Sequence, residues 1–309
     1  MLGNKRSRYV LTAAAAVVLL GVLVGVVACG GDSKPKSDAQ PGVTAGSHSS
    51  VEASPSLEPP VIPTSAAPPS PSPTDAQPSP SNPASRAAED GFNVRPPGTG
   101  HGPADSLLRT AGTNVALTFD DGPDPVNTPA ILKVLKDNGV KATFCMVGFR
   151  VRDHPELVRQ IYADGHTLCN HSWQHLLNLG KRDPSYIEWD LRHTNDMIHA
   201  AVGNDAPIKY FRAPGGNFTP SLVAKAKELG MTSIYWDVDP QDWNHRPDRN
   251  DQTHIDRVIA QVKSHVRQGS IILSHDNGQP DTIVAYRTLI PWLKRYFVLE
   301  GLPTGPGAG

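Results

Sequence analysis

The sequence predicts an α/β domain in which parallel strands form a barrel or an open doubly wound sheet. From Asn114 onward, short β-branched or aromatic runs alternate with amphipathic stretches of helical length. Strand, helix, strand connections within one sheet are right-handed and make the strands parallel. Polar residues follow the ends of these runs, and in both architectures the chemistry gathers at the carboxyl ends of the strands.

The N-terminus predicts export and anchoring. Three basic residues lie within the first eight positions and precede an apolar run over residues 10–27, which is typical of a signal sequence. Residues 26–29 (Val-Val-Ala-Cys) resemble the lipobox of bacterial lipoproteins, so we expect residues 1–29 to be a signal peptide and Cys29 to be lipidated. The alternative is an uncleaved membrane helix in which Cys29 is incidental. Both place the rest of the chain outside the cytoplasm, on the outer face of a bacterial cell membrane.

Residues 30–110 are predicted to be a disordered linker. Fifteen of the 30 prolines lie between positions 30 and 100, among Ser, Ala and Thr and with few large apolar residues. A semi-extended linker of this length would carry a domain into a cell wall, although a solvated spacer without such a role is the alternative. Residues 111–300 form the predicted folded domain, and 301–309 a flexible tail.

Composition excludes two classes of protein. A net charge of −1 without a basic cluster argues against nucleic acid as a partner. Three cysteines are too few for a small disulfide framework. We expect a monomer.

The predicted elements alternate along the domain. Strands are expected over residues 115–119, 142–147, 167–169, 210–212, 232–236 and 270–274. Helices are expected over residues 128–138, 155–164, 186–202, 221–229 and 254–266.

Polar side chains of catalytic type follow five of these strands. Because the carboxyl ends of parallel strands meet at one edge, we expect one site there. The residues are Asp120, Asp121, Asn170, His171, His175, Arg212, Asp237, Asp239, His275 and Asp276.

The residue types predict a metal-assisted hydrolysis. His171 and His175, four positions apart, can converge on one ion, and one carboxylate of the Asp120 and Asp121 pair can complete a three-ligand site with positions left open. Such a site suits Zn²⁺. The second carboxylate can take a proton from water, and His275 can protonate a leaving amine.

Five ordered segments resemble the motifs of the polysaccharide deacetylases, carbohydrate esterase family 4, also called the NodB-like homology domain. They are residues 118–123 (Thr-Phe-Asp-Asp-Gly-Pro), 171–175 (His-Ser-Trp-Gln-His), 212–216 (Arg-Ala-Pro-Gly-Gly), 239–243 (Asp-Pro-Gln-Asp-Trp) and 273–275 (Leu-Ser-His). The resemblance implies a distorted (β/α) barrel that removes acetyl groups from acetylated glycan polymers with a divalent metal.

The resemblance also implies roles around the metal. Asp120 would be the general base, while Asp121, His171 and His175 would bind the ion. Arg212 would hold Asp120 through an ion pair and keep it charged. Zn²⁺ is the expected ion, with Co²⁺ or another divalent ion as alternatives.

Further roles follow for the proton donor and the substrate pocket. His275 would be the general acid, oriented by Asp239. Trp243 and Leu273 would wall the acetyl pocket, and the backbone amide of Gly215 would help to hold the oxyanion.

One residue departs from the family pattern, and a pair of cysteines lies outside it. The family usually has an aromatic residue where Gly215 stands, so a sugar contact is lost there, and Phe218 is a candidate replacement. Cys145 and Cys169 lie on neighbouring predicted strands in an oxidising compartment, so a disulfide is possible, with two buried thiols as the alternative.

The expected function is removal of N-acetyl groups from peptidoglycan sugars, because an anchored enzyme meets its own wall first. Chitin or chitooligosaccharide deacetylation and acetylxylan hydrolysis are the alternatives within the enzyme class. A wall-binding lipoprotein without activity is a further alternative, as is a non-haem Fe(II) oxygenase, which uses two His and one carboxylate on a different scaffold.

Overall fold

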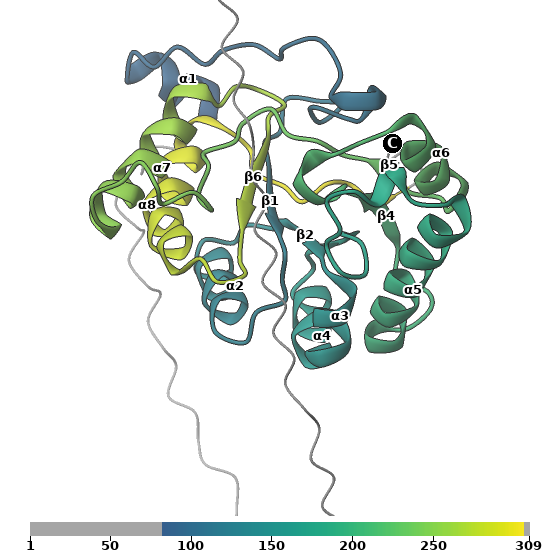
Figure 1. Ribbon diagram of the computed structural model, residues 1–309. Helices are drawn as coiled ribbons and strands as arrows, with labels where there is room; N and C mark the ends of the chain where they lie inside the picture. Colours follow the sequence, from purple (N-terminus) through teal and green to yellow (C-terminus); the bar gives the residue numbers. More distant parts are fainter. Residues whose placement is uncertain (1–81, 306–309) are drawn as a thin grey trace, which may run out of the picture. The chain divides into compact units, whose positions relative to one another are not determined.

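The structure is a computed structural model that describes residues 82–305. Its strands are β1 (Ala116–Asp120), β2 (Thr143–Met146), β3 (Thr167–Asn170), β4 (Ile208–Phe211), β5 (Thr232–Ser233) and β6 (Ile271–His275). All neighbours pair in parallel, and the order across the sheet is β5-β4-β3-β2-β1-β6 (Figure 1). The predicted α/β barrel class is confirmed.

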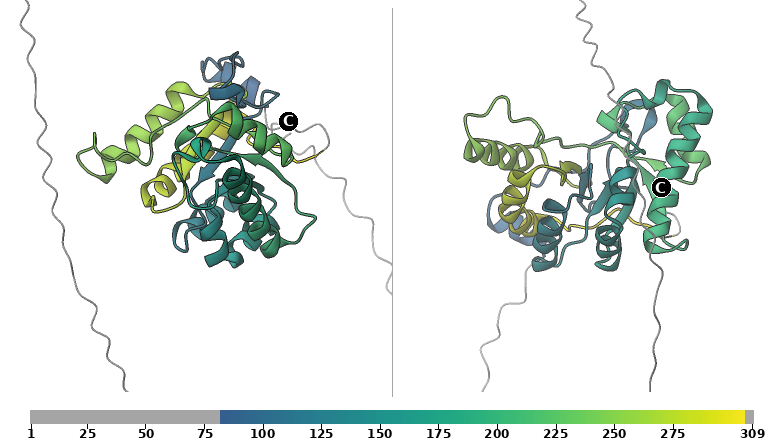
Figure 2. Two further views of the ribbon diagram at one scale, coloured as in Figure 1. Left: turned by 45° about the vertical axis from the view of Figure 1, so that its right-hand side comes forward. Right: turned by 60° about the horizontal axis from the view of Figure 1, so that its bottom comes forward.

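Helices alternate with the strands and surround the curved sheet (Figure 2). They are α1 (Pro83–Glu89), α2 (Asn127–Asp137), α3 (Gly148–Asp153), α4 (Pro155–Ala163), α5 (Pro184–Val202), α6 (Pro220–Glu228), α7 (Asp251–His265) and α8 (Pro280–Tyr296), with 3₁₀ turns η1 (Pro103–Asp105), η2 (Leu179–Lys181) and η3 (Pro214–Gly216). The five predicted helices are present as α2, α4, α5, α6 and α7, whereas α1, α3 and α8 were not predicted from the sequence.

The two faces of the sheet have different side chains. In β1, Leu117 and Phe119 belong to the main apolar core, which the helices cover. Ala116 belongs to a smaller cluster on the other face. Because side chains alternate along a strand, Thr118 and Asp120 share that second face, and both are buried. The strands thus carry an apolar outer face and a partly polar inner face.

The barrel is closed irregularly between β5 and β6. The strand predicted over residues 232–236 ends at Ser233, and Ile234 next forms a bridge with Leu107. Arg109 bridges Ser270, beside β6, and forms an ion pair with Asp237. A segment from before β1 therefore fills the space between the two edge strands.

The folded domain begins earlier than the sequence predicts. Helix α1 lies within the predicted linker, and Phe92 stacks on Tyr296 of α8 with ring centroids 4.3 Å apart. Asp90 accepts hydrogen bonds from Arg295 (2.6 Å) and from the Tyr296 hydroxyl (2.9 Å). The predicted linker boundary at residue 110 is therefore wrong for residues 82–110, which belong to the fold through contacts with the last helix and with the segments near β5 and β6.

The start of the predicted C-terminal tail is also part of the fold. Leu302 is 2% exposed, and its N–H donates to Thr143 Oγ1 (2.9 Å). Its carbonyl accepts from Thr167 Oγ1 (2.7 Å). The prediction of a flexible tail beginning at residue 301 is wrong at this point, because β2 and β3 bind the segment.

The predicted signal peptide, including Cys29, and most of the predicted linker lie outside the described residues. Between residues 82 and 305, none of the helices combines the length and the apolar character that crossing a bilayer requires.

Candidate active site

The end of β1 places two carboxylates in different directions. Asp120 is the last residue of the strand and is 2% exposed, on the inner face of the sheet. Asp121 has a φ of +74° and leaves the strand geometry, so its side chain turns away from that of Asp120. One carboxylate is thereby held inside the barrel end, and the other faces the loop after β3.

The loop after β3 presents both predicted histidines to Asp121. Nε2 of His171 and Nε2 of His175 each lie 3.3 Å from Asp121 Oδ1. Ser172 has a φ of +65°, and its hydroxyl accepts the His175 N–H (3.0 Å), which turns the loop back on itself. This tight turn brings the two histidines, which are four positions apart in the sequence, to the same oxygen of Asp121.

The orientation of His171 is set by a backbone carbonyl. Its Nδ1 lies 2.8 Å from the carbonyl oxygen of Arg212, which can only accept, so Nδ1 carries the hydrogen. Nε2 then directs its lone pair toward Asp121, as in many metal-binding histidines.

The three side chains fit a divalent ion. Their donor atoms lie within 4.8 Å of one another, and Asp121 Oδ1 is a buried atom without a hydrogen-bond partner. One carboxylate and two imidazoles are a ligand set typical of a catalytic site with open positions. The predicted ligands Asp121, His171 and His175 are therefore brought together.

The protonation preferences of this cluster also favour a cation. Burial opposes ionisation of Asp121, but the nearby His171 outweighs it, with smaller contributions from His275 and His175, and the pKa of Asp121 is held well below its usual range. Burial lowers the pKa of His175, with a further contribution from His171. Burial also disfavours charge on His171, yet Asp120 and Asp121 raise its pKa. The carboxylates thus stabilise positive charge at a point that a metal ion would occupy.

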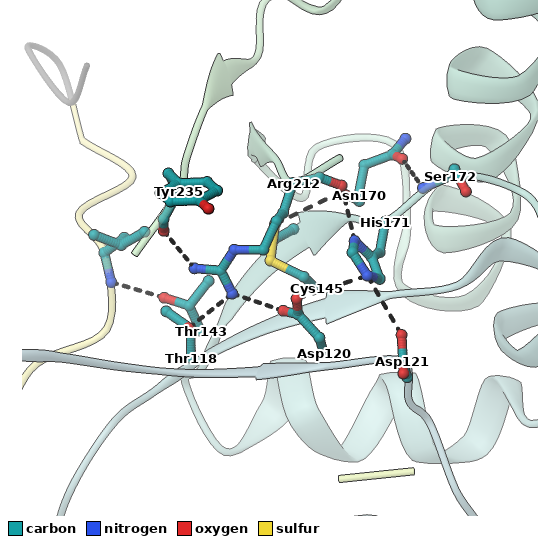
Figure 3. The surroundings of a disulfide bond; sticks show 12 residues. Thr118, Asp120, Asp121, Thr143, Cys145, Asn170, His171, Ser172, Arg212 and Tyr235 are labelled. Carbon is teal, nitrogen blue, oxygen red and sulfur yellow. Dashed lines mark hydrogen bonds and ion pairs between the residues drawn. A yellow bond between two sulfur atoms is a disulfide. The ribbon is translucent and has the colours of Figure 1, made fainter. Parts of the chain in front are cut away.

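Asp120 is held by a buried arginine (Figure 3). Arg212 Nη1 donates to Asp120 Oδ1 (2.7 Å) and to Thr118 Oγ1 (2.8 Å), and Nη2 donates to the Tyr235 carbonyl (2.9 Å). The arginine is fully buried. Such a charged pair needs several hydrogen bonds to offset the loss of water, and Thr118 and Tyr235 supply them. The second Asp120 oxygen lies 3.6 Å from His171 Nε2, so the carboxylate borders the metal cluster.

The hydrogen-bond partner of His275 corrects one prediction. His275 Nδ1 lies 2.8 Å from Asp242 Oδ1, and its backbone N–H donates to Asp242 Oδ2 (2.8 Å). Asp239, which the sequence analysis assigned to this role, instead accepts the Gln241 N–H at 2.7 Å and so caps its own turn. Both aspartates belong to the same motif, but only Asp242 is fully buried against His275.

The environment of His275 suits a proton donor. Burial disfavours its charged form, but the charge and hydrogen bond of Asp242 outweigh burial, with help from Asp121 and Asp120, and raise the pKa of His275 to about 10. Thr282 Oγ1 donates to Asp242 Oδ2 (2.7 Å) and holds the carboxylate from behind. This environment therefore favours the protonated form of His275, which can donate a proton.

These groups border one cavity of about 460 Å³. Gly215 and Leu273, predicted from the sequence, line it, and so does Trp243, which is 52% exposed at its rim. Phe218 does not line it, because its ring packs against Phe211 and Tyr235. The remaining lining residues are Asp120, Asp121, His171, His175, Leu177, Gly216, Asn217, Trp236, Asp239 and His275.

Trp236 is a lining residue that the sequence analysis did not identify. Its ring stacks on Tyr235 with centroids 3.8 Å apart, and it lies over Gly216 so closely that a β-carbon there would be 2.6 Å from the ring. Gly216 also has a φ of +68°, which favours glycine. Gly216 therefore makes room for an aromatic side chain from the segment after β5.

A disulfide lies directly beneath the site (Figure 3). Cys145 and Cys169 are partners in the register of β2 and β3, and they form a buried disulfide with Cα atoms 4.2 Å apart. Cys145 is also the register partner of Asp120. Of the two alternatives for these cysteines, the structure has the bonded one.

Comparison with known proteins gives a consistent result. Residues 108–234 match the polysaccharide deacetylase family model. A chitooligosaccharide deacetylase from Sinorhizobium fredii is 37% identical over 209 residues, which is 63% of this chain and 92% of that protein. A peptidoglycan-N-acetylglucosamine deacetylase from Bacillus cereus is 34% identical over 185 residues, 59% of this chain and 82% of that protein.

A solved structure shows the same fold. A family 4 pseudoenzyme from Bacillus anthracis superposes with a TM-score of 0.57 at 28% identity, over 64% of this chain and 67% of that one. The match in sequence to the deacetylases, together with the architecture and the arrangement of motif residues around one cavity, leads to one assignment: the chain belongs to the polysaccharide deacetylase family, carbohydrate esterase family 4.

Proposed function

We propose that this protein is a divalent-metal-dependent hydrolase that removes N-acetyl groups from the sugars of cell-wall peptidoglycan. The observation that carries the proposal is the layout of the cavity. The Asp121, His171 and His175 donor set lies between a carboxylate paired with Arg212 and an imidazolium paired with Asp242. Amide hydrolysis requires a base that activates water and an acid that protonates the leaving amine, and both border this cavity.

Each residue of the site has a separate role in the proposed reaction. An ion held by the donor set would polarise the acetyl carbonyl and make an attacking water more acidic. Asp120 accepts the proton of that water, while the Arg212 pair keeps its carboxylate in place. Gly215 lines the cavity, and its backbone amide would donate to the developing oxyanion. His275 gives its proton to the leaving amine, so that acetate and a free amino sugar result.

The cavity lining supports the acetyl group as the part of the substrate that enters the cavity. Leu273 and Trp243 are apolar side chains of the cavity lining, which suits a methyl group.

Each positioned proton transfer is worth about 10² to 10⁴ in rate. Loss of either the base or the acid should therefore reduce turnover without preventing the substrate from binding.

The choice of polymer is supported by the relatives and by the expected location. The Bacillus cereus relative is a peptidoglycan-N-acetylglucosamine deacetylase, and the predicted anchoring through Cys29 would place this chain next to a cell wall. A chitooligosaccharide deacetylase is the second candidate function, because the relative from Sinorhizobium fredii carries that name at 37% identity. Both polymers carry N-acetyl groups on β-1,4-linked pyranoses.

Three finer points belong to the same proposal. Zn²⁺ is the ion we favour, because one carboxylate and two imidazoles suit it. We place the protein on the outer face of the cell membrane, held by a lipid on Cys29. We expect it to act as a monomer. A Cys29→Ser variant should fail to incorporate radiolabelled fatty acid, and equal labelling would refute the lipid anchor.

The central experiment measures acetate release. Metal-loaded protein is incubated in parallel with acetylated peptidoglycan, chitooligosaccharides and xylan, and we expect the fastest release from peptidoglycan. Faster release from chitooligosaccharides would favour the second candidate function. Binding to peptidoglycan without acetate release would indicate a wall-binding protein without activity.

A pair of variants tests the division of roles. Asp120→Asn should abolish turnover and retain the metal, whereas His171→Ala should lose both turnover and metal, because only His171 belongs to the donor set. Metal content by mass spectrometry and acetate release are measured on the same samples. Equal metal loss in the two variants would contradict these assignments.

A further inference from the structure

The Asp242 loop (residues 239–244) holds the carboxylate of Asp242 against His275. It must present Asp242 to both Nδ1 and the backbone N–H of His275, each at 2.8 Å. It also contains Gln241 with a φ of +54°, which costs a non-glycine residue energy. Trp243 in the same loop is half exposed. Polar contacts from outside the loop also hold it, and α7 supplies them.

Arg257 of α7 binds the loop on both sides of Asp242. Its Nη1 donates to the Pro240 carbonyl (2.8 Å), and its Nη2 donates to the Asn244 carbonyl (2.8 Å) and lies 3.3 Å from the Gln241 carbonyl oxygen. A guanidinium is planar and has fixed donor directions, so these bonds define the relative positions of the carbonyls. Helix α7 lies next to α8 on the β6 side of the sheet (Figure 1).

His254, one turn earlier on α7, binds the carbonyl of Asp242 itself. Its Nε2 lies 2.9 Å from the Asp242 carbonyl oxygen, so Nε2 carries the hydrogen. Its Nδ1 lies 3.0 Å from Arg257 Nη2 and 2.8 Å from Asp248 Oδ2. The ring therefore connects the Asp242 carbonyl with both Arg257 and Asp248.

Asp248 joins the two side chains of α7. It accepts from Arg257 Nε at 3.0 Å on both oxygens and from Nη2 at 2.8 Å. Its side chain is 8% exposed and that of His254 is fully buried. Charged groups with so little water need paired partners, so the position of each member depends on the others.

A cation site is a less suitable explanation of the same histidine. His245, His254 and Asp281 place possible ligand atoms within 4.8 Å of one another. Both ring nitrogens of His254, however, already have protein partners, and a cation would have to break the contact with Asp242 or with Asp248 and Arg257.

We propose that Arg257, His254 and Asp248 form a positioning clamp that aligns the Asp242 loop with His275. None of the three touches the substrate cavity, so they act through Asp242. The inference rests on the proposed function for its kinetic readout, because His275 must act as the proton donor for the clamp to influence turnover.

The kinetic test compares Arg257→Met with a matched control on the same helix. Thr253→Ala removes the reciprocal cap between Thr253 and Asn250 and destabilises the start of α7 without touching the loop carbonyls. We expect Arg257→Met to lower kcat by about 10- to 100-fold. Thr253→Ala should change kcat by less than about twofold, because cap removal affects the helix end alone. Thermal melts show that each variant is folded at the assay temperature.

A double-mutant cycle and a conservative variant test whether Arg257 and His254 act on turnover through Asp242. If Arg257 acts through Asp242, adding Arg257→Met to Asp242→Asn should lower kcat no further. His254→Gln can still donate to the Asp242 carbonyl and should retain more activity than His254→Ala. Additive losses in the cycle, or equal losses for the two His254 variants, would overturn the clamp.

A spectroscopic readout is independent of the substrate. In the zinc-loaded protein, the Nδ1 proton shared by His275 and Asp242 should give a proton NMR resonance far downfield. It should be lost or shifted in Arg257→Met and unchanged in Thr253→Ala. Persistence of this resonance in Arg257→Met would refute the clamp. If the wild-type protein released no acetate from any polymer, the proposed function would be refuted. The resonance of Arg257→Met compared with that of the wild-type protein would still test whether the clamp positions Asp242.

Discussion

Asp242 is the residue on which the proton donor depends. Its charge keeps His275 protonated with a pKa of about 10, against the effect of burial. Asp242→Asn should lower kcat by roughly 100-fold or more, because the imidazolium loses its counter-charge. The loss of activity at high pH should also move to lower pH, since the pKa of His275 falls. Acetate release across a pH series measures both effects.

Asp239→Asn is the matched control for this prediction. Asp239 lines the cavity but has no hydrogen bond to His275 within the described residues, so the high-pH limb should stay in place. A shift of that limb in Asp239→Asn, with none in Asp242→Asn, would restore the assignment made from the sequence.

His166 is expected to make stability depend on pH. Burial, with a smaller contribution from Lys141, lowers its pKa to about 4, and its Nδ1 accepts the Ala142 N–H (3.1 Å). The folded state therefore favours the neutral ring. The unfolded chain binds the proton near the usual value of about 6.5, so the free energy of unfolding falls as pH drops from there toward 4.

The expected loss attributable to His166 between pH 7.5 and pH 5 is about 2 kcal/mol. Urea unfolding at the two pH values measures it. His166→Asn keeps an acceptor near the Ala142 amide and has no titrating ring, so its stability should change less. The same pH dependence in both proteins would show that other groups cause it.

At the scale of the elements, the disulfide links two strands that carry the site. Cys145 and Cys169 are separated by 24 positions, so closing this loop should stabilise the folded state by about 3 kcal/mol in the chain-entropy model. The double variant Cys145→Ala/Cys169→Ala should lose about that much in urea unfolding. Adding a reductant should then lower the stability of the wild-type protein but not that of the variant.

The helices show how far local pattern determines structure. α2, α4, α5, α6 and α7 were predicted because apolar residues recur at helical spacing, and their ends differ from prediction by at most three residues. Helix α7 begins earlier than predicted because Asn250 and Thr253 cap it. Helix α8 contains Pro291, which ordinarily disfavours a helix, and its packing against α7 and α1 compensates.

At the scale of the whole molecule, the segment before β1 belongs to the barrel. It contributes the Phe92 stack on Tyr296, the Leu107 bridge to Ile234 and the ion pair of Arg109 with Asp237. A chain that begins at residue 111 should therefore melt at least about 10 °C below one that begins at residue 82. Circular dichroism melts compare the two, and equal melting temperatures would support the boundary predicted from sequence.

The sequence alone determined the fold class, the order of the six strands and of five helices, and the motif residues that border the cavity, because strand alternation and motif spacing are local properties. Only the tertiary structure decided that Asp242 rather than Asp239 meets His275. It also decided that Trp236 lies over Gly216, and that residues 82–110 complete the domain. Each of these depends on contacts between segments far apart in the chain, and no local pattern encodes which of two equivalent side chains becomes buried.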